Sequence, residues 1–156
     1  TDALTGVYNR RYFKQKAEEE IELTKRLGRS FSVIMLDLDQ FKNINDNFGH
    51  DIGDASLKTI SHCIMEKIRK TDTLARWGGE EFVIILTDIN RQIASDIAEK
   101  LRKRIMNTEI PIAGRVTASF GVTDYEDGDT VDDLIQRADR MLYLAKLEGR
   151  NCVKHI

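Results

Sequence analysis

The stretch FSVIMLDLD, residues 31–39, decides the fold. Its first six residues, FSVIML, form an almost unbroken apolar run bounded by polar residues. A short run of this kind is typical of a β-strand that is buried on both faces. The run ends in the segment Asp37-Leu38-Asp39. We therefore expect a central strand that carries carboxylates at its C-terminal end.

Helix and strand signals continue on both sides of this strand. Asn9, Asn90 and the Thr130–Asp133 pair, an acidic variant of the capping box, mark helix starts ahead of apolar residues at helical spacing. The pair Gly78-Gly79 lies between two strand-like runs and predicts a β-hairpin with a primed turn. The expected helices cover residues 10–27, 51–68, 91–105 and 131–148, and the expected strands cover 31–36, 73–77, 80–86, 115–122 and 152–156.

The order of these elements is α, β, α, ββ, α, β, α, β. Its central β-α-β-β-α-β part resembles the split βαβ pattern of ferredoxin-like sheets. Such a sheet is mostly antiparallel and carries helices on its faces. We therefore expect an α/β protein of the α+β type, with one domain over residues 1–156. Many unrelated functions share this fold, so the fold alone does not give the chemistry.

Composition excludes several classes of protein. With 156 residues, 41% of them hydrophobic, the chain is not disordered and can bury a core without disulfides. Its net charge of −2, with scattered Lys and Arg, argues against binding of a nucleic acid polymer. Cys63 and Cys152 lack metal-site spacing and predict free thiols in a reducing cytoplasm. Without a signal peptide or a long apolar run, we expect a soluble cytoplasmic domain, although a longer protein could be membrane-anchored.

Two carboxylates are expected to meet at one edge of the sheet. Asp37 ends the first strand and Glu80 follows the glycine turn, and in a split βαβ sheet these two elements are neighbours. Hard oxygen ligands in a shallow site suit Mg²⁺ that is shared with substrate phosphates. The glycines would let the backbone approach that ligand closely. The alternative is an ordinary hairpin with surface glutamates and a solvated aspartate after a strand.

Four motifs, in order along the chain, carry a resemblance to a known family. They are DALTGVYNRR at residues 2–11, DLDQFKNIND with GHDIGD at 37–54, GGEEF at 78–82, and AD, YLAK and GRN at 138–139, 143–146 and 149–151. Together they resemble the GGDEF domains, which are diguanylate cyclases, in the GGEEF form. Met141 stands where the family pattern has alanine. The resemblance covers essentially the whole chain and implies a palm-like nucleotidyl cyclase fold.

The resemblance implies a metal site and a set of catalytic residues. Asp37, Glu80 and the backbone carbonyl of Leu38 would ligate Mg²⁺, with Mn²⁺ as an alternative ion. Glu80 is also a candidate base for the attacking 3′-hydroxyl, the alternative being that a metal deprotonates it unaided. Glu81 is implied to be needed for activity. Gly78 and Gly79 would form part of the substrate site.

The resemblance also implies residues that bind substrate and product. Asn45 and Asp54 would bind guanine, since the guanine edge offers N–H donors to a carboxylate. The cations Lys42, Lys146 and Arg150 would neutralise the triphosphate, the alternative being that they are solvated surface charges. Arg69 and Asp72 match an R-x-x-D motif, placed a fixed distance before Gly78, that would bind product and inhibit the enzyme. The alternative for this motif is a helix C-terminus with favourable basic residues.

The function that the resemblance implies is condensation of two GTP molecules into cyclic di-GMP and two pyrophosphates. A homodimer is expected, in which two GTP-bound protomers face each other, together with an upstream sensor domain outside this chain. One rival is a catalytically inactive module that senses GTP or cyclic di-GMP. Another is an interaction domain of ferredoxin-like shape, which would leave the dense polar motifs unexplained.

Overall fold

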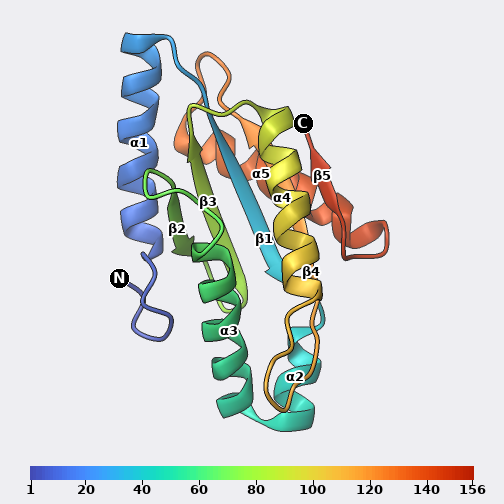
Figure 1. The fold of residues 1–156 in the computed structure, drawn as a ribbon. Coiled ribbons are helices and arrows are strands. Elements are labelled where there is room, and N and C mark those ends of the chain that lie inside the picture. Colours follow the sequence, from blue (N-terminus) through green and yellow to red (C-terminus); the bar gives the residue numbers. More distant parts are fainter.

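A five-stranded sheet forms the centre of the molecule, in the order β2-β3-β1-β4-β5 (Figure 1). This computed structural model describes residues 1–156. β1 (Phe31–Leu38) lies in the middle and pairs antiparallel with β3 (Glu81–Thr87) and with β4 (Ala118–Asp124). β2 (Thr73–Arg76) pairs antiparallel with β3, whereas β5 (Val153–His155) pairs parallel with β4. The sheet is thus mostly antiparallel and has the expected ferredoxin-like order.

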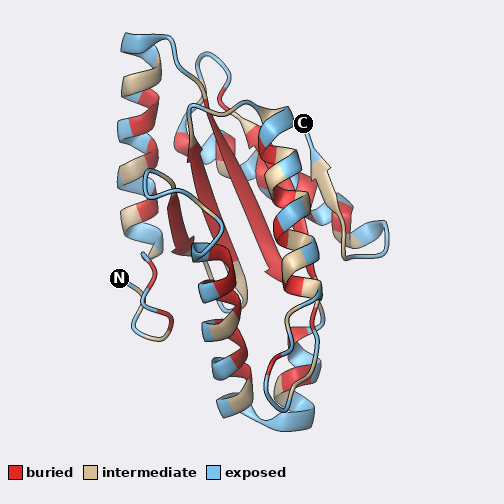
Figure 2. Cartoon of the chain, viewed as in Figure 1, coloured by how far each residue is buried: buried red, intermediate tan, exposed pale blue.

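Helices cover both faces of this sheet. α2 (Phe41–Phe48), α3 (His50–Met65) and α4 (Arg91–Met106) contribute to one buried apolar cluster. α1 (Arg10–Leu27) and α5 (Val131–Leu147) contribute to a second cluster on the other face. All eight residues of β1 are buried as a result, which explains its unbroken apolar run (Figure 2). None of the five helices is long and apolar enough to cross a lipid bilayer.

The helix starts that the sequence marks are confirmed. The side chain of Asn9 accepts a hydrogen bond from the Tyr12 backbone N–H, and Asn90 accepts one from Ile93. Thr130 and Asp133 form the expected reciprocal capping box at the start of α5. These bonds satisfy N–H groups that would otherwise lack partners in the first turn of each helix.

The glycine hairpin differs from its prediction. A primed turn needs a positive φ at its central residues, and neither Gly78 nor Gly79 has one. Instead, the carbonyl of Glu81 accepts hydrogen bonds from the N–H groups of Trp77 and Gly78, at 2.8 and 3.4 Å. The turn is therefore wider than predicted and begins one residue earlier.

Several element boundaries also differ. The sequence prediction omits α2, a short helix separated from α3 by Gly49 alone, whose φ is 89°. α3 ends at Met65, so Ile68 packs against the core from beyond the helix. β4 begins at Ala118 rather than at residue 115, because residues 110–117 form a loop in which Ile110 and Gly114 are bridged. β1 continues to Leu38, two residues past its apolar run.

Candidate functional site

Three strands end together where the expected acidic residues lie. In the register of the sheet, Asp37 of β1 is the partner of Glu81 on β3 and of Ser119 on β4. The N–H of Leu38 donates to the carbonyl of Glu80 at 3.2 Å. The antiparallel pairing therefore brings Asp37, Leu38, Glu80 and Glu81 side by side, and the sequence led us to expect the meeting of Asp37 and Glu80.

Asp37 is a buried carboxylate that is paired with one cation. Its exposed fraction is 6%, and its Oδ2 accepts a hydrogen bond of 2.5 Å from Nζ of Lys146 on α5. Burial raises the pKa of Asp37 to about 6, and the charges of Glu80 and Glu81 add to this rise, while Lys146 opposes it. The site thus holds more negative charge than its single lysine balances.

The neighbouring groups show the same imbalance. Burial raises the pKa of Glu81, with Asp139 and Glu80 contributing and Lys146 opposing. Burial lowers the pKa of Lys146, but its hydrogen bond to Asp37 and the nearby acidic groups outweigh that effect and leave the pKa raised. A further cation would be stabilised among these carboxylates.

The donor set fits an ion that shares its coordination with a substrate. No three His, Cys, Asp or Glu side chains are grouped to hold a metal by themselves. The predicted ligands are two carboxylates, Asp37 and Glu80, and one carbonyl, that of Leu38. Mg²⁺ prefers such oxygen ligands and commonly takes its remaining positions from water and phosphate. These residues therefore fit Mg²⁺ better than a metal enclosed by protein alone.

Next to the acidic residues lies a hollow of about 300 Å³, which we call the Asn45 hollow. Its lining comes from the α2–α3 region and the glycine loop, and it includes five predicted substrate or metal residues: Lys42, Asn45, Asp54, Gly79 and Glu80. The Oδ1 atom of Asn45 is buried and has no hydrogen-bond partner. A buried acceptor of this kind normally has a donor, so this atom favours a ligand that carries N–H groups.

Arg76 holds the glycine loop and was not identified from the sequence. Its Nη2 and Nε donate to the carbonyl of Gly79 at 2.7 and 3.1 Å, and Nε also reaches the carbonyl of Gly78 at 3.2 Å. Nη1 forms an ion pair with Asp2 at 3.4 Å. The N-terminal motif is thus joined to the signature loop. A lone arginine at a strand end gives no sequence signal for this bond.

Arg150 lies in a different hollow from Lys42. We call this second hollow, of about 400 Å³, the Arg150 hollow. Its lining comes from the start of α2, the segment before β4 and the segment after α5. Asp39 is part of its wall, and its carboxylate accepts hydrogen bonds from Thr117 and Ser119, both at 2.6 Å. The sequence did not mark Asp39 as a site residue, because both partners are distant along the chain.

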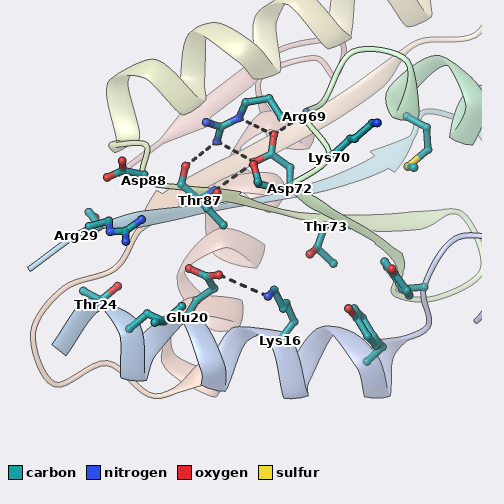
Figure 3. Close-up of a pocket in the computed structure, with 16 residues that line it drawn as sticks. Lys16, Glu20, Thr24, Arg29, Arg69, Lys70, Asp72, Thr73, Thr87 and Asp88 are labelled. Atoms are coloured by element: carbon teal, nitrogen blue, oxygen red, sulfur yellow. Dashed lines mark hydrogen bonds and ion pairs between the residues drawn. The ribbon is translucent and has the colours of Figure 1, made fainter. Parts of the chain in front are cut away.

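Arg69 and Asp72 are bound to each other at the Thr87 end of β3, the opposite end of this strand from Glu81. Arg69 donates to the Asp72 carboxylate at 2.8 and 3.1 Å and to the carbonyl of Thr87 at 2.6 Å (Figure 3). They line a hollow of about 540 Å³, the Arg69 hollow, whose other wall is the side of α1 that carries Lys16 and Glu20. This hollow shares no lining residue with the Asn45 hollow, so the two sites are separate.

The fold and the acidic strand ends together are those of a palm-like nucleotidyl cyclase. The sequence model of the family described as "Diguanylate cyclase, GGDEF domain" matches residues 1–152, and the chain belongs to this family. The chain is 40% identical over 159 residues to the response regulator PleD of Caulobacter vibrioides. That match includes 98% of this chain but only 35% of PleD.

Solved structures agree with this assignment. The active GGEEF domain of a diguanylate cyclase from Vibrio cholerae is 33% identical, with a TM-score of 0.91, and the match covers 96% of this chain and 97% of that one. The GGDEF domain of DgcB from Caulobacter crescentus, solved in complex with c-di-GMP, is 28% identical, with a TM-score of 0.93. That match covers 99% of this chain and 92% of the DgcB chain.

Proposed function

We propose that this domain is a diguanylate cyclase that condenses two GTP molecules into cyclic di-GMP and two pyrophosphates. The observation that carries the proposal is the Asn45 hollow, where predicted guanine-binding residues lie beside Glu80. Membership of the GGDEF family supports the same reaction. In the proposed mechanism, each 3′-hydroxyl attacks the α-phosphate of the other GTP, and the O–P bond to pyrophosphate breaks.

The residues divide into groups by their chemistry. Asn45 and Asp54 bind the guanine edge, because an ionised carboxylate accepts two N–H bonds from it. Gly78 and Gly79 admit the phosphates close to the backbone: a Cβ on Gly79 would meet no protein atom within 4 Å, so the protein itself leaves this space open. Phosphate charge is neutralised by Lys42, Lys146 and Arg150. On binding of GTP, Lys146 would give up its hydrogen bond to Asp37 and bind a phosphate oxygen instead.

Asp37, Glu80 and the Leu38 carbonyl would hold Mg²⁺, or Mn²⁺ in its place. The bound ion supplies charge stabilisation of the phosphate oxygens and activation of the attacking hydroxyl. In this proposal Glu80 would accept the hydroxyl proton, the alternative being that the metal deprotonates the hydroxyl unaided, and Glu81 would add negative charge beside it. Because the product is two-fold symmetric and each chain has one such site, the active form is a homodimer.

Turnover of GTP tests the proposal. Purified domain, incubated with GTP and Mg²⁺, should form cyclic di-GMP, identified by mass spectrometry, and should form none with a chelator. Glu80→Ala removes an expected metal ligand and should reduce turnover by at least about a hundredfold. Glu18→Ala, an exposed glutamate on α1, is the matched control and should keep parental turnover.

Full turnover by Glu80→Ala would contradict the assignment. If the parent binds GTP but forms no product at any enzyme concentration, the domain is a sensing module of the kind considered above.

We further propose that cyclic di-GMP inhibits the domain by binding at Arg69 and Asp72. The support is the fixed position of the Arg69 guanidinium, held by Asp72 and Thr87 at the wall of the Arg69 hollow. Binding there is allosteric, because this hollow is separate from the substrate site.

Arg69→Ala should therefore relieve inhibition by added product while leaving the initial rate unchanged. Lys67→Ala, an exposed neighbour, should leave inhibition as in the parent. Identical inhibition of Arg69→Ala and parent, or purely competitive inhibition of the parent, contradicts this regulatory site.

A further inference from the structure

The Arg150 hollow carries a second arginine that the family motifs do not include. Its lining combines Gln40 and Asn43 from the start of α2, Arg115 and Thr117 from the loop before β4, and Arg150 after α5. The hollow begins at Asp39, directly after the Asp37-Leu38 pair that we expect to hold the metal. It shares no lining residue with the Asn45 hollow, although α2 contributes residues to both.

Asp39, the acidic residue in this wall, already accepts three hydrogen bonds from neighbouring residues. Its Oδ2 accepts hydrogen bonds from Thr117 Oγ1 at 2.6 Å and from the Asn151 N–H at 3.0 Å, and its Oδ1 accepts one from Ser119 at 2.6 Å. Neither Arg115 nor Arg150 forms an ion pair or a side-chain hydrogen bond. The hollow thus combines two arginines that form no ion pair with one carboxylate, that of Asp39, whose hydrogen-bond donors are all neutral.

The backbone fixes the position of both arginines. Arg150 has a φ of 64°, and its N–H donates to the carbonyl of Ala145 at 3.0 Å. Arg115 lies between Gly114, which exchanges two hydrogen bonds of 2.7 and 2.8 Å with Ile110, and Val116, which is buried. Two arginines on fixed backbone at one hollow are a suitable arrangement for phosphate, since each guanidinium can bind it with two N–H donors.

We propose that Arg115 acts with Arg150 as a second contact for the terminal phosphates of GTP and for the pyrophosphate that leaves. This inference rests on the proposed function and deepens it. The guanine base occupies the Asn45 hollow, and the ribose and α-phosphate lie at Glu80. The chain of phosphates then extends past the end of β1 into the Arg150 hollow. Arg115 is a substrate-positioning residue in this arrangement and takes no proton.

Binding of inorganic pyrophosphate, measured by calorimetry in Mg²⁺ buffer, tests the role of Arg115. Arg115→Gln should weaken pyrophosphate and GTP binding by about tenfold, the loss expected for one charge-assisted contact, and should leave GMP binding unchanged. Arg115→Lys should recover part of the loss. Arg26→Gln, at an exposed arginine in the last turn of α1, should bind all three ligands as the parent does.

Equal pyrophosphate affinity of Arg115→Gln and parent, at equal thermal stability, overturns the proposal, and so does a parent that binds no pyrophosphate. The outcome is separable from that of the proposed function. A parent that forms no cyclic di-GMP refutes cyclase activity, while pyrophosphate binding that depends on Arg115 would still support the anion site.

Discussion

Burial disfavours the ionised form of the Asp37 side chain, although the proposed chemistry needs that form. The Asp37 side chain is 6% exposed, and its pKa is about 6 in the native state, compared with about 3.8 in the unfolded chain. Between these two values the native carboxyl group still holds a proton that the unfolded chain has lost. The free energy of unfolding therefore falls as the pH rises through about 6, the pKa in the native state. The stability that protonated Asp37 contributes is fully present only below the pKa that this residue has in the unfolded chain.

Asp37→Asn should consequently stabilise the metal-free domain while it abolishes turnover. In a chelator at pH 7, we expect its free energy of unfolding to exceed that of the parent by about 2 kcal/mol, because the buried charge is gone. The difference should vanish near about pH 3, below both pKa values, where the native and unfolded states of the parent are both protonated. Denaturant unfolding at the two pH values measures this, with Asp46→Asn, at an exposed aspartate, as control. A variant less stable than the parent at pH 7 would show that the Lys146 ion pair outweighs burial.

The α2–α3 element shows why some of the site could not be predicted from sequence. α2 is eight residues long, and its apolar positions Phe41, Ile44 and Phe48 are too few for a clear periodic signal. A single residue, Gly49, with a φ of 89°, then joins α2 to α3. Because two short helices are joined so closely, Asn45 of α2 lies against Gly53 of α3, a contact that no single-helix pattern reveals.

Gly53 is expected to set the position of Asn45. A Cβ at Gly53 would lie 1.9 Å from Asn45 Oδ1, so Gly53→Ala must displace the amide from the Asn45 hollow. We expect GTP affinity to fall by about tenfold, because a hydrogen bond in the base site is lost, while the domain stays folded. Calorimetry with GTP measures the effect, and Lys58→Ala, exposed on the same helix, is the control. Unchanged affinity in Gly53→Ala would mean that Asn45 does not bind the base.

At the scale of the whole molecule, the sequence predicted the sheet order and the meeting of Asp37 with Glu80, because both follow from strand patterns and the antiparallel hairpin. It could not predict bonds between segments that only the tertiary fold brings together. The Lys146–Asp37 bond spans 109 positions of the chain, and the Arg76–Asp2 ion pair spans 74. The Arg150 hollow could not be predicted for the same reason, since three segments that are distant along the chain form it.

The N-terminal segment bears on how two domains would be joined. Asn9 caps α1, and the preceding residues turn back on the sheet, where the N–H of Tyr8 donates to the carbonyl of Leu74 at 3.2 Å and the carbonyl of Tyr8 accepts from Arg76 at 2.9 Å. An upstream helix would therefore connect through this turn rather than continue α1 directly. It would also lie close in sequence to Asp2, which contacts the signature loop through Arg76.

Each chain has one Asn45 hollow and one set of acidic residues, and the proposed product contains two identical halves, so in the proposed mechanism neither chain completes the reaction alone. We expect an isolated domain that is largely monomeric, with activity per mole that rises with enzyme concentration. A coiled coil fused before Thr1 should raise activity further, because tethering gives an effective concentration of about millimolar, whereas free domains meet by diffusion.

Initial rates over a wide range of enzyme concentration, with sedimentation on the same samples, measure this dependence. A fused helix with a disrupted heptad pattern is the matched control and should behave as the isolated domain. A rate strictly proportional to enzyme concentration, with only monomer across the range, would exclude the two-chain mechanism.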